Sequence, residues 1–181
     1  MTKELSIKSI KKELMNAFLG DMRIINSFAN KEVKKVTDYI GTNICGYLYD
    51  NENGIYTDTY IHFDVMKSRG CYDVFIILKA DKNLIRNEAV NCLDDISECI
   101  EEIVNELYPY HKSYSDAPVN VVSDNYVRRN IRFSLCQDDA EKYEKSVLVN
   151  IQNGAFNADN DGYIRASDVM LNGKISVKCT D

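Results

Sequence analysis

The feature that most constrains the fold is a helical pattern in residues 87–107, set between segments that have the pattern of β-strands. Apolar residues recur there every three or four positions, a spacing that places their side chains on one face of an α-helix. This stripe consists of Ala89, Leu93, Ile96, Ile100, Ile103 and Leu107, widened by Cys92, Cys99 and Val104. The opposite side is acidic, and Pro109 ends the pattern. We therefore predict a long helix that packs one face on a core.

The segments on either side of this helix have the period of β-strands. In residues 59–66, Ile61, Phe63 and Val65 alternate with polar residues, which predicts a half-buried strand. Residues 72–80 are more continuously apolar and predict a central strand, joined to the first by a short turn as an antiparallel hairpin. Further strands are expected at residues 119–123, 127–136 and 146–151, and a short polar helix at 137–145.

The N-terminal part of the chain is predicted to be helical. Residues 6–30 carry apolar side chains at helical spacing, with a break at Gly20 and with Asp21 as the N-cap of a second short helix. A third short helix is expected at residues 31–39. Helices and strands that are segregated along a chain favour an antiparallel sheet covered by helices.

The predicted fold class is therefore α+β: N-terminal helices, then a ββαββ antiparallel sheet covered by the long amphipathic helix, then a small C-terminal β extension. We predict a core domain at residues 1–151, of which 1–40 are helical and 59–151 form the sheet and its helix. Residues 152–181 are predicted to form a β-hairpin extension, because Asn172 and Gly173 make a hairpin turn signal.

The chain carries a net charge of -6 at pH 7, and its six cysteines are scattered without any C-x-x-C pair. A surplus of acidic residues disfavours sequence-specific binding to nucleic acid, whose phosphates are held by Lys and Arg. Residues 1–12 lack the apolar segment of a signal peptide, and no stretch has the roughly 20 apolar residues that span a bilayer. We therefore expect a cytoplasmic protein with reduced thiols and no membrane contact, a disulfide or zinc framework being the alternative.

No catalytic residue is predicted. The two histidines, His62 and His111, have no nucleophile or metal ligand at a meaningful spacing, and the sequence contains no Walker loop, G-x-S-x-G or H-E-x-x-H motif. We expect the protein not to be an enzyme and to need no cofactor.

One segment has the pattern of a calcium site. Residues 157–168 overlay the loop of an EF-hand, in which clustered oxygen ligands lie on a tight turn. The candidate ligands are Asn157, Asp159, Asp161 and Asp168. Arg165 at the ninth position and the short Asp168 at the twelfth depart from the pattern, so a β-turn rich in Asp, Asn and Gly is the other interpretation. The alternative function is a calcium-dependent binding or interaction module.

Two charged patches are candidates for a contact between subunits. The candidates for a basic patch are Arg128, Arg129 and Arg132 on one predicted strand, with Lys8, Lys11 and Lys12 on the first predicted helix. Glu98, Glu101 and Glu102 belong to the acidic face of the long helix. The hypothesis is that the acidic face of one subunit meets the basic patch of another; a solvated helix face is the plain alternative.

The order of these predicted strands and helices resembles that of the small neck proteins of tailed bacteriophages, in particular the tail terminator (tail completion) type. The resemblance covers residues 59–138. It is carried by the strands T-Y-I-H-F-D-V and Y-D-V-F-I-I-L, the acidic helix that follows and the two later strands.

The resemblance implies a structural subunit that forms a ring with itself, commonly six-fold, so a hexamer is expected. Such a ring joins the tail tube to the head connector, contacts other neck and tail-tube proteins, and lets DNA pass through its lumen without sequence-specific binding. The expected location is the virion neck, with assembly in the host cytoplasm. Whether the position in the neck is that of a terminator, a stopper or an adaptor stays open.

Overall fold

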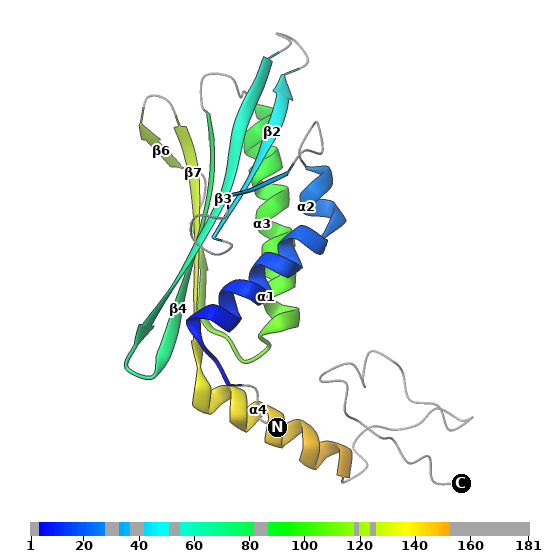
Figure 1. Ribbon diagram of the computed structural model, residues 1–181, viewed down its shortest axis with the longest axis vertical. Helices are drawn as coiled ribbons and strands as arrows, with labels where there is room; N and C mark the ends of the chain where they lie inside the picture. Colours follow the sequence, from blue (N-terminus) through cyan, green and yellow to red (C-terminus); the bar gives the residue numbers. More distant parts are fainter. Residues whose placement is uncertain are drawn as a thin grey trace, which may run out of the picture.

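The computed structural model describes residues 4–27, 33–36, 42–50, 55–81, 87–117, 120–123 and 126–152. These residues form an α+β fold in which helices pack on one face of an antiparallel sheet (Figure 1). The predicted α+β class and the antiparallel sheet are confirmed. The predicted β-hairpin extension after Gln152 lies outside the described residues, and so do the four candidate calcium ligands.

The sheet of the described chain has seven strands in the order β1-β2-β3-β4-β7-β5, and β6 also pairs with β7. Every pair is antiparallel. The strands are β1 (Lys34–Val36), β2 (Asn43–Asp50), β3 (Ile55–Ser68), β4 (Cys71–Asp81), β5 (Lys112–Asp116), β6 (Asn120–Ser123) and β7 (Tyr126–Cys136). The helices of the described residues are α1 (Ile7–Gly20), α2 (Met22–Asn26), α3 (Asn87–Leu107) and α4 (Gln137–Gln152).

The hairpin of β3 and β4 is the predicted one, and its register explains the alternating sequence. Ile61 lies opposite Leu78, and Phe63 lies opposite Ile76, so the apolar residues of both strands share one face. The two turn residues, Arg69 and Gly70, have φ angles of 50° and 80°. Positive φ at both positions is what the tight hairpin turns that match strand twist require, and Gly adopts it without a steric cost.

The breaks between the first helices also follow the prediction. Ser6 caps α1, and its side chain accepts a hydrogen bond from the backbone of Ser9 at 3.1 Å. After Gly20, the Asp21 side chain accepts from the Arg23 backbone at 2.8 Å and so begins α2. The side-chain hydrogen bond from Arg23 to Asp21 lowers the pKa of that carboxyl.

Two predicted elements are wrong. In place of a helix at residues 31–39, Lys34–Val36 is the edge strand β1, which pairs with β2. Pairing with an available edge outweighs a weak local helix preference in so short a segment. In place of a strand at residues 146–151, α4 continues to Gln152. A helix satisfies its backbone groups within itself, whereas a strand there would need an edge to pair with.

Three strands were not predicted, so the order of elements differs from ββαββ. The strands β1 and β2 precede the hairpin of β3 and β4, and β5 stands between α3 and β6. The segments N-I-C-G-Y-L-Y-D of β2 and K-S-Y-S-D of β5 lack a clean alternation of apolar and polar residues. Their pairing partners decide their structure.

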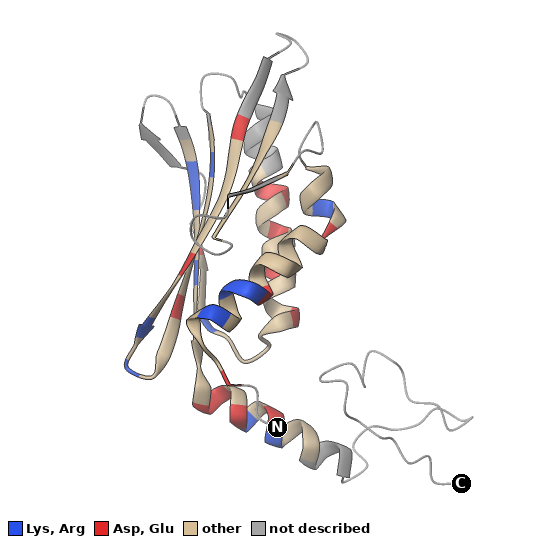
Figure 2. Cartoon of the chain, viewed as in Figure 1, with Lys and Arg blue, Asp and Glu red and all other residues tan. Residues whose placement is uncertain are grey.

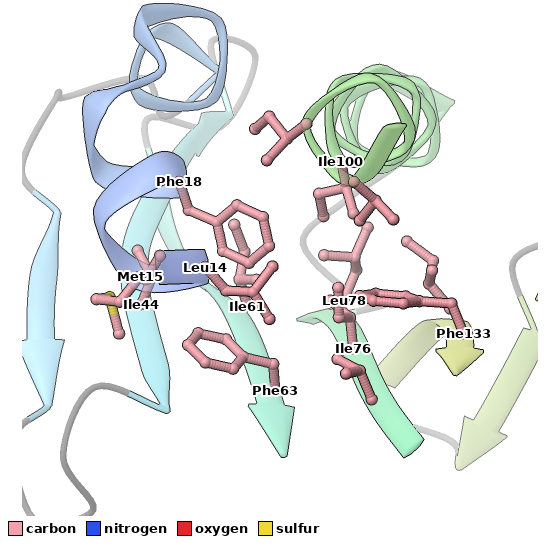
Figure 3. Close-up of a cluster of buried hydrophobic side chains, with 14 of the residues drawn as sticks. Leu14, Met15, Phe18, Ile44, Ile61, Phe63, Ile76, Leu78, Ile100 and Phe133 are labelled. Carbon is pink, nitrogen blue, oxygen red and sulfur yellow. The ribbon is translucent and has the colours of Figure 1, made fainter. Parts of the chain in front are cut away.

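The core lies between the sheet and a layer of two helices. Figure 3 shows Leu14, Met15 and Phe18 of α1 facing Ile44, Ile61 and Phe63 of the strands β2 and β3. Beside them, Ile100 of α3 lies over Leu78 and Phe133 of β4 and β7. Phe18 and Phe63 meet edge to face with ring centroids 5.6 Å apart. Because α1 and α3 share the covering of the sheet, the long helix is not its only cover.

A disulfide joins Cys71 at the start of β4 to Cys136 at the end of β7. The two residues are direct partners in the sheet, with Cα atoms 4.2 Å apart. Such a pair is within reach of a disulfide, so the expectation of reduced thiols is wrong for these two residues. Their separation of 65 residues hides this proximity from the sequence. Cys45 and Cys99 carry thiols.

Placing a charge on the core side of α3 tests the orientation of the helix. Ile96 is fully buried, so Ile96→Asp should destabilise the domain by about 4 kcal/mol or more, because the carboxylate has no partner there. Asn105→Asp is the matched control, since it adds the same charge at an exposed position of the same helix. Thermal unfolding followed by circular dichroism should separate the two. Equal melting temperatures would show that the helix faces the other way.

Removing the disulfide tests whether it stabilises the sheet. Cys71→Ser should lower the free energy of unfolding of the oxidised protein by about 2–4 kcal/mol, because the bond restricts a long loop of the unfolded chain. Urea unfolding with and without reductant measures this loss. Reductant should destabilise the wild type and a Cys45→Ser control equally, and it should leave Cys71→Ser unchanged. A wild type that unfolds at the same urea concentration in both conditions would contradict the prediction.

Candidate functional site

The face of the sheet that lies away from the helices is the first candidate surface. In Figure 1, α1, α2 and α3 all lie on the other side of the sheet. Side chains of β4 and β7 that alternate with the core residues point to this outer face, where Phe75 lies opposite Arg132 and Ile77 lies opposite Asn130. Lys79 lies opposite Arg128 at the far end of the same pair of strands. We call Lys79, Arg128 and Arg132 the basic sheet surface.

The two arginines of this surface have donor groups to spare. The Arg132 side chain is 56% exposed, and its guanidinium carbon lies 5.1 Å from the centre of the Phe75 ring. Its ion pair with Asp73 is long, at 3.6 Å. The Nε of Arg128 is buried and has no hydrogen-bond partner among the described residues. A buried donor without a partner costs free energy, and this atom lies beneath the surface, out of reach of another molecule.

Arg129, which the sequence placed in the same basic patch, points the other way. Strand alternation turns its side chain toward the helices, where it is only 18% exposed. Its Nε and Nη2 donate to the two carboxylate oxygens of Asp116 on β5, at 2.7 and 2.8 Å. Its Nη1 pairs with Asp94 of α3. Arg129, predicted as an interface residue, is thus engaged within its own chain, where it clamps β5, β7 and α3 together.

The partners of Arg129 explain why a charged side chain is tolerated in this partly buried position. Hydrogen bonds from Arg129 to Asp116 raise the pKa of the guanidinium, which stays charged although it is partly buried. Ser97 of α3 donates a further hydrogen bond to Asp116. Two parallel N–H···O bonds between a guanidinium and a carboxylate are among the strongest polar contacts in proteins, and they fix both partners in orientation.

The exposed side of α3 is the second candidate surface. Four of its carboxylates are exposed and have no ion pair among the described residues; they are Asp95, Glu98, Glu101 and Glu106. We call them the acidic helix surface. Glu102, also predicted as an interface residue, pairs with Arg23 of α2, which Asp21 holds in turn at 2.8 Å. Glu102 is thus engaged within its own chain, while Glu98 and Glu101 remain available.

The histidines and the tyrosines after α3 serve the packing of the fold. His62 pairs with Asn43 across β2 and β3, and the His111 ring lies 2.7 Å from the carbonyl of Tyr108. Tyr108 is fully buried, and its hydroxyl donates a hydrogen bond to Glu13 of α1 at 2.7 Å. Burial raises the pKa of this hydroxyl. Burial likewise raises the pKa of the half-buried Tyr110 to about 12. These groups do not converge on a reacting centre.

Among the described residues, no three His, Cys, Asp or Glu side chains are grouped so that they could hold a metal ion. In the same part of the chain, no helix combines the length and the apolar character needed to cross a membrane.

Comparison with known proteins adds no relative: a scan of protein-family models, a search of curated proteins and a search of solved structures each return no match to this chain.

Sequence reasoning missed the partners of Arg129 because pairing between strands brings them together. Asp116 is 13 residues away along the chain, and Asp94 is 35 residues away. One signal was present in the sequence. Arg129 lies two residues before Ile131, so strand alternation places it on the same apolar face of the strand. A charge in that phase indicates a buried ion pair, because an unpaired buried charge is too costly.

A double-mutant cycle tests the clamp. Arg129→Met should cost roughly 3 kcal/mol of stability, because it leaves the carboxylate of Asp116 partly buried without its partner. Replacing both residues, as Arg129→Met with Asp116→Leu, should recover much of that loss, since the stranded charge is gone. Urea unfolding of the three variants and the wild type gives the coupling energy. If the two single losses simply add in the double variant, the residues do not act as a pair.

Proposed function

We propose that this protein is a structural subunit that assembles with copies of itself into a ring in the neck of a tailed bacteriophage, between the tail tube and the head connector. The role in the neck comes from the resemblance of residues 59–138 to tail terminator proteins. The observation that carries self-assembly is the outer face of the sheet, which no helix of the described chain covers. No catalytic step and no cofactor belong to the proposal.

The residues of the outer face support a role in protein contacts. The solvated face of an antiparallel sheet usually carries polar side chains. Here Phe75 and Ile77 lie side by side with Arg132 and Asn130, and Met66 on the neighbouring strand is 58% exposed. Aromatic residues, Met and Arg are the types enriched in the contacts between proteins. This face therefore resembles one side of an interface more than a plain solvated surface.

The charge of the chain supports the same role. DNA that passes through the lumen of a ring must not be held by it. A protomer with a net charge of -6 has no basic surplus with which to hold phosphates, because that attraction depends on Lys and Arg. The remaining surfaces of such a ring would meet other neck and tail-tube proteins, first in the host cytoplasm and then in the virion.

The mass of the purified full-length protein tests the proposal. We expect native mass spectrometry and light scattering, over a range of concentrations, to show one closed oligomer, a hexamer by the resemblance. Electron micrographs of that species should show rings with a central opening. A monomer at every concentration, with or without reductant, would contradict a ring that closes by itself. A monomer that gains the mass of bound calcium would favour the binding module of residues 157–168.

A further inference from the structure

The disulfide lies where two strands, a helix and the N-terminal segment meet. Cys71 is the first residue of β4, Cys136 is the last residue of β7, and α4 begins at the next residue, Gln137. The neighbouring Tyr72 and Leu135 are buried in the core, so strand alternation turns both cysteines toward the outer face, where they are half-buried. The disulfide therefore lies outside the core, on the side from which a small thiol would approach.

The two residues that follow the cysteines hold the backbone of Leu5. The Leu5 N–H donates to Oε1 of Gln137 at 2.6 Å, and the Leu5 carbonyl accepts from the Tyr72 hydroxyl at 2.9 Å. Leu5 is only 3% exposed, and buried backbone groups need such partners. Tyr72 follows Cys71 in β4, and Gln137 follows the other cysteine at the start of α4. The disulfide therefore keeps both partners of Leu5 in one place. We call Leu5, its two partners and the two cysteines the junction.

The junction is also the point where α4 is attached. Figure 1 shows that α4 continues from the end of β7 and extends away from the helix layer. Its contacts with the rest of the domain include an ion pair of Asp139 with the exposed Lys112 at 2.7 Å, which contributes little to stability. They also include the rings of Tyr143 and Tyr110, whose centroids are 6.0 Å apart.

The remainder of α4 faces water. Leu148 is 49% exposed, and Figure 2 shows acidic and basic residues mixed along this helix, as expected of a solvated helix. The position of α4 therefore depends largely on its first turns, next to the junction.

We propose that the disulfide is a redox-sensitive latch on this junction. When the bond is formed, the end of β7 cannot separate from β4, so Leu5 and the start of α4 are fixed. When a thiol reduces the bond, the two strand ends open locally and Leu5 loses its two partners. The N-terminal segment and α4 then become free to move while the sheet stays folded, because strand ends open at a much lower cost than the centre of a sheet. The latch does not depend on assembly into a ring.

The reaction is thiol–disulfide exchange, with glutathione as the small thiol. The thiolate of one glutathione attacks one Sγ, forms a mixed disulfide and releases the other Sγ as a thiolate, which takes up a proton. A second glutathione thiolate attacks the glutathione sulfur of the mixed disulfide, forms oxidised glutathione and releases the second cysteine. Two electrons thus pass to the protein, and Cys71 and Cys136 take up the two protons that the glutathione thiols lose. Oxidised glutathione reverses these steps, since pairing of β4 with β7 brings the two thiols together again.

Hydrogen–deuterium exchange of the full-length protein, with and without glutathione, tests the latch. On reduction, the intact wild type should gain two hydrogens more than a variant that carries Cys71→Ser and Cys136→Ser. Peptides that contain Leu5, and peptides from residues 137–144 of α4, should then exchange about 10-fold faster or more, because the junction opens without unfolding of the rest. Peptides from the centre of β4, around Ile76, should exchange at the same rate in both states.

Matched variants separate a latch from a plain covalent staple. Cys71→Ser with Cys136→Ser should exchange rapidly at the N-terminal peptide in both conditions. Tyr72→Phe with Gln137→Ala keeps the disulfide and removes the two hydrogen bonds to the N-terminal segment, so this peptide should exchange rapidly even in the oxidised protein. Cys45→Ser is the control, since it removes a thiol outside the junction, and it should respond to glutathione as the wild type does.

The contrary outcomes are distinct from one another. A disulfide that stays intact in excess glutathione is a permanent staple, which would overturn the inference. Unchanged exchange at the junction, or equal acceleration around Ile76, would overturn it too, because reduction would then act nowhere or on the whole domain. If oxidation still slows the N-terminal peptide of the variant with Tyr72→Phe and Gln137→Ala, the disulfide does not act through Leu5. None of these outcomes bears on the ring, which native mass spectrometry tests separately.

Discussion

The alternation of side chains along β4 and β7 is the constraint on which the rest of the structure depends. In β7, Ile131 and Phe133 lie under the helices, and the residues that alternate with them, such as Arg132, point outward. A shift of one residue would exchange the two faces, so burial of one face fixes the register of the whole sheet. The disulfide between Cys71 and Cys136 holds the same register at one end of the pair. This pairing determines which side chains of the sheet lie in the core and which lie on the charged outer surface.

The alternation of side chains along β7 places Arg129 on the buried face of the sheet and Arg128 and Arg132 on the outer face. Arg129 falls on the buried side, where a charge is tolerated only with a close partner, and it finds Asp116 on β5. That pair fastens a short strand with a weak apolar pattern to the edge of β7. Arg128 and Arg132 fall on the outer side, where the Arg132 side chain is 56% exposed and forms a long ion pair with Asp73. One strand therefore both stabilises the fold and presents a surface, because its two faces meet different surroundings.

How far the sequence predicted the structure depends on how local each signal is. The helix at residues 87–107 matches α3, and the hairpin and the cap at Asp21 are confirmed, because periodicity and caps are read within a few residues. The strands β1, β2 and β5 were missed because strands further along the chain determine them. The same holds for the disulfide. Among the candidate interface residues, the sequence could not show that Arg129 and Glu102 have partners in their own chain.

In the proposed ring, the angle between neighbouring copies would depend on how the sheet and α3 pack on each other inside each domain. The basic sheet surface belongs to β4 and β7, and the acidic helix surface belongs to α3. The core between the sheet and α3 joins them through residues such as Ile100 and Phe133. The clamp of Arg129 ties the same two elements by an oriented ion pair. Because close-packed cores resist small displacements, the sheet surface and the helix surface keep a fixed orientation to each other. A fixed orientation gives every copy the same rotation, which a contact must have if it is to close a ring of one size.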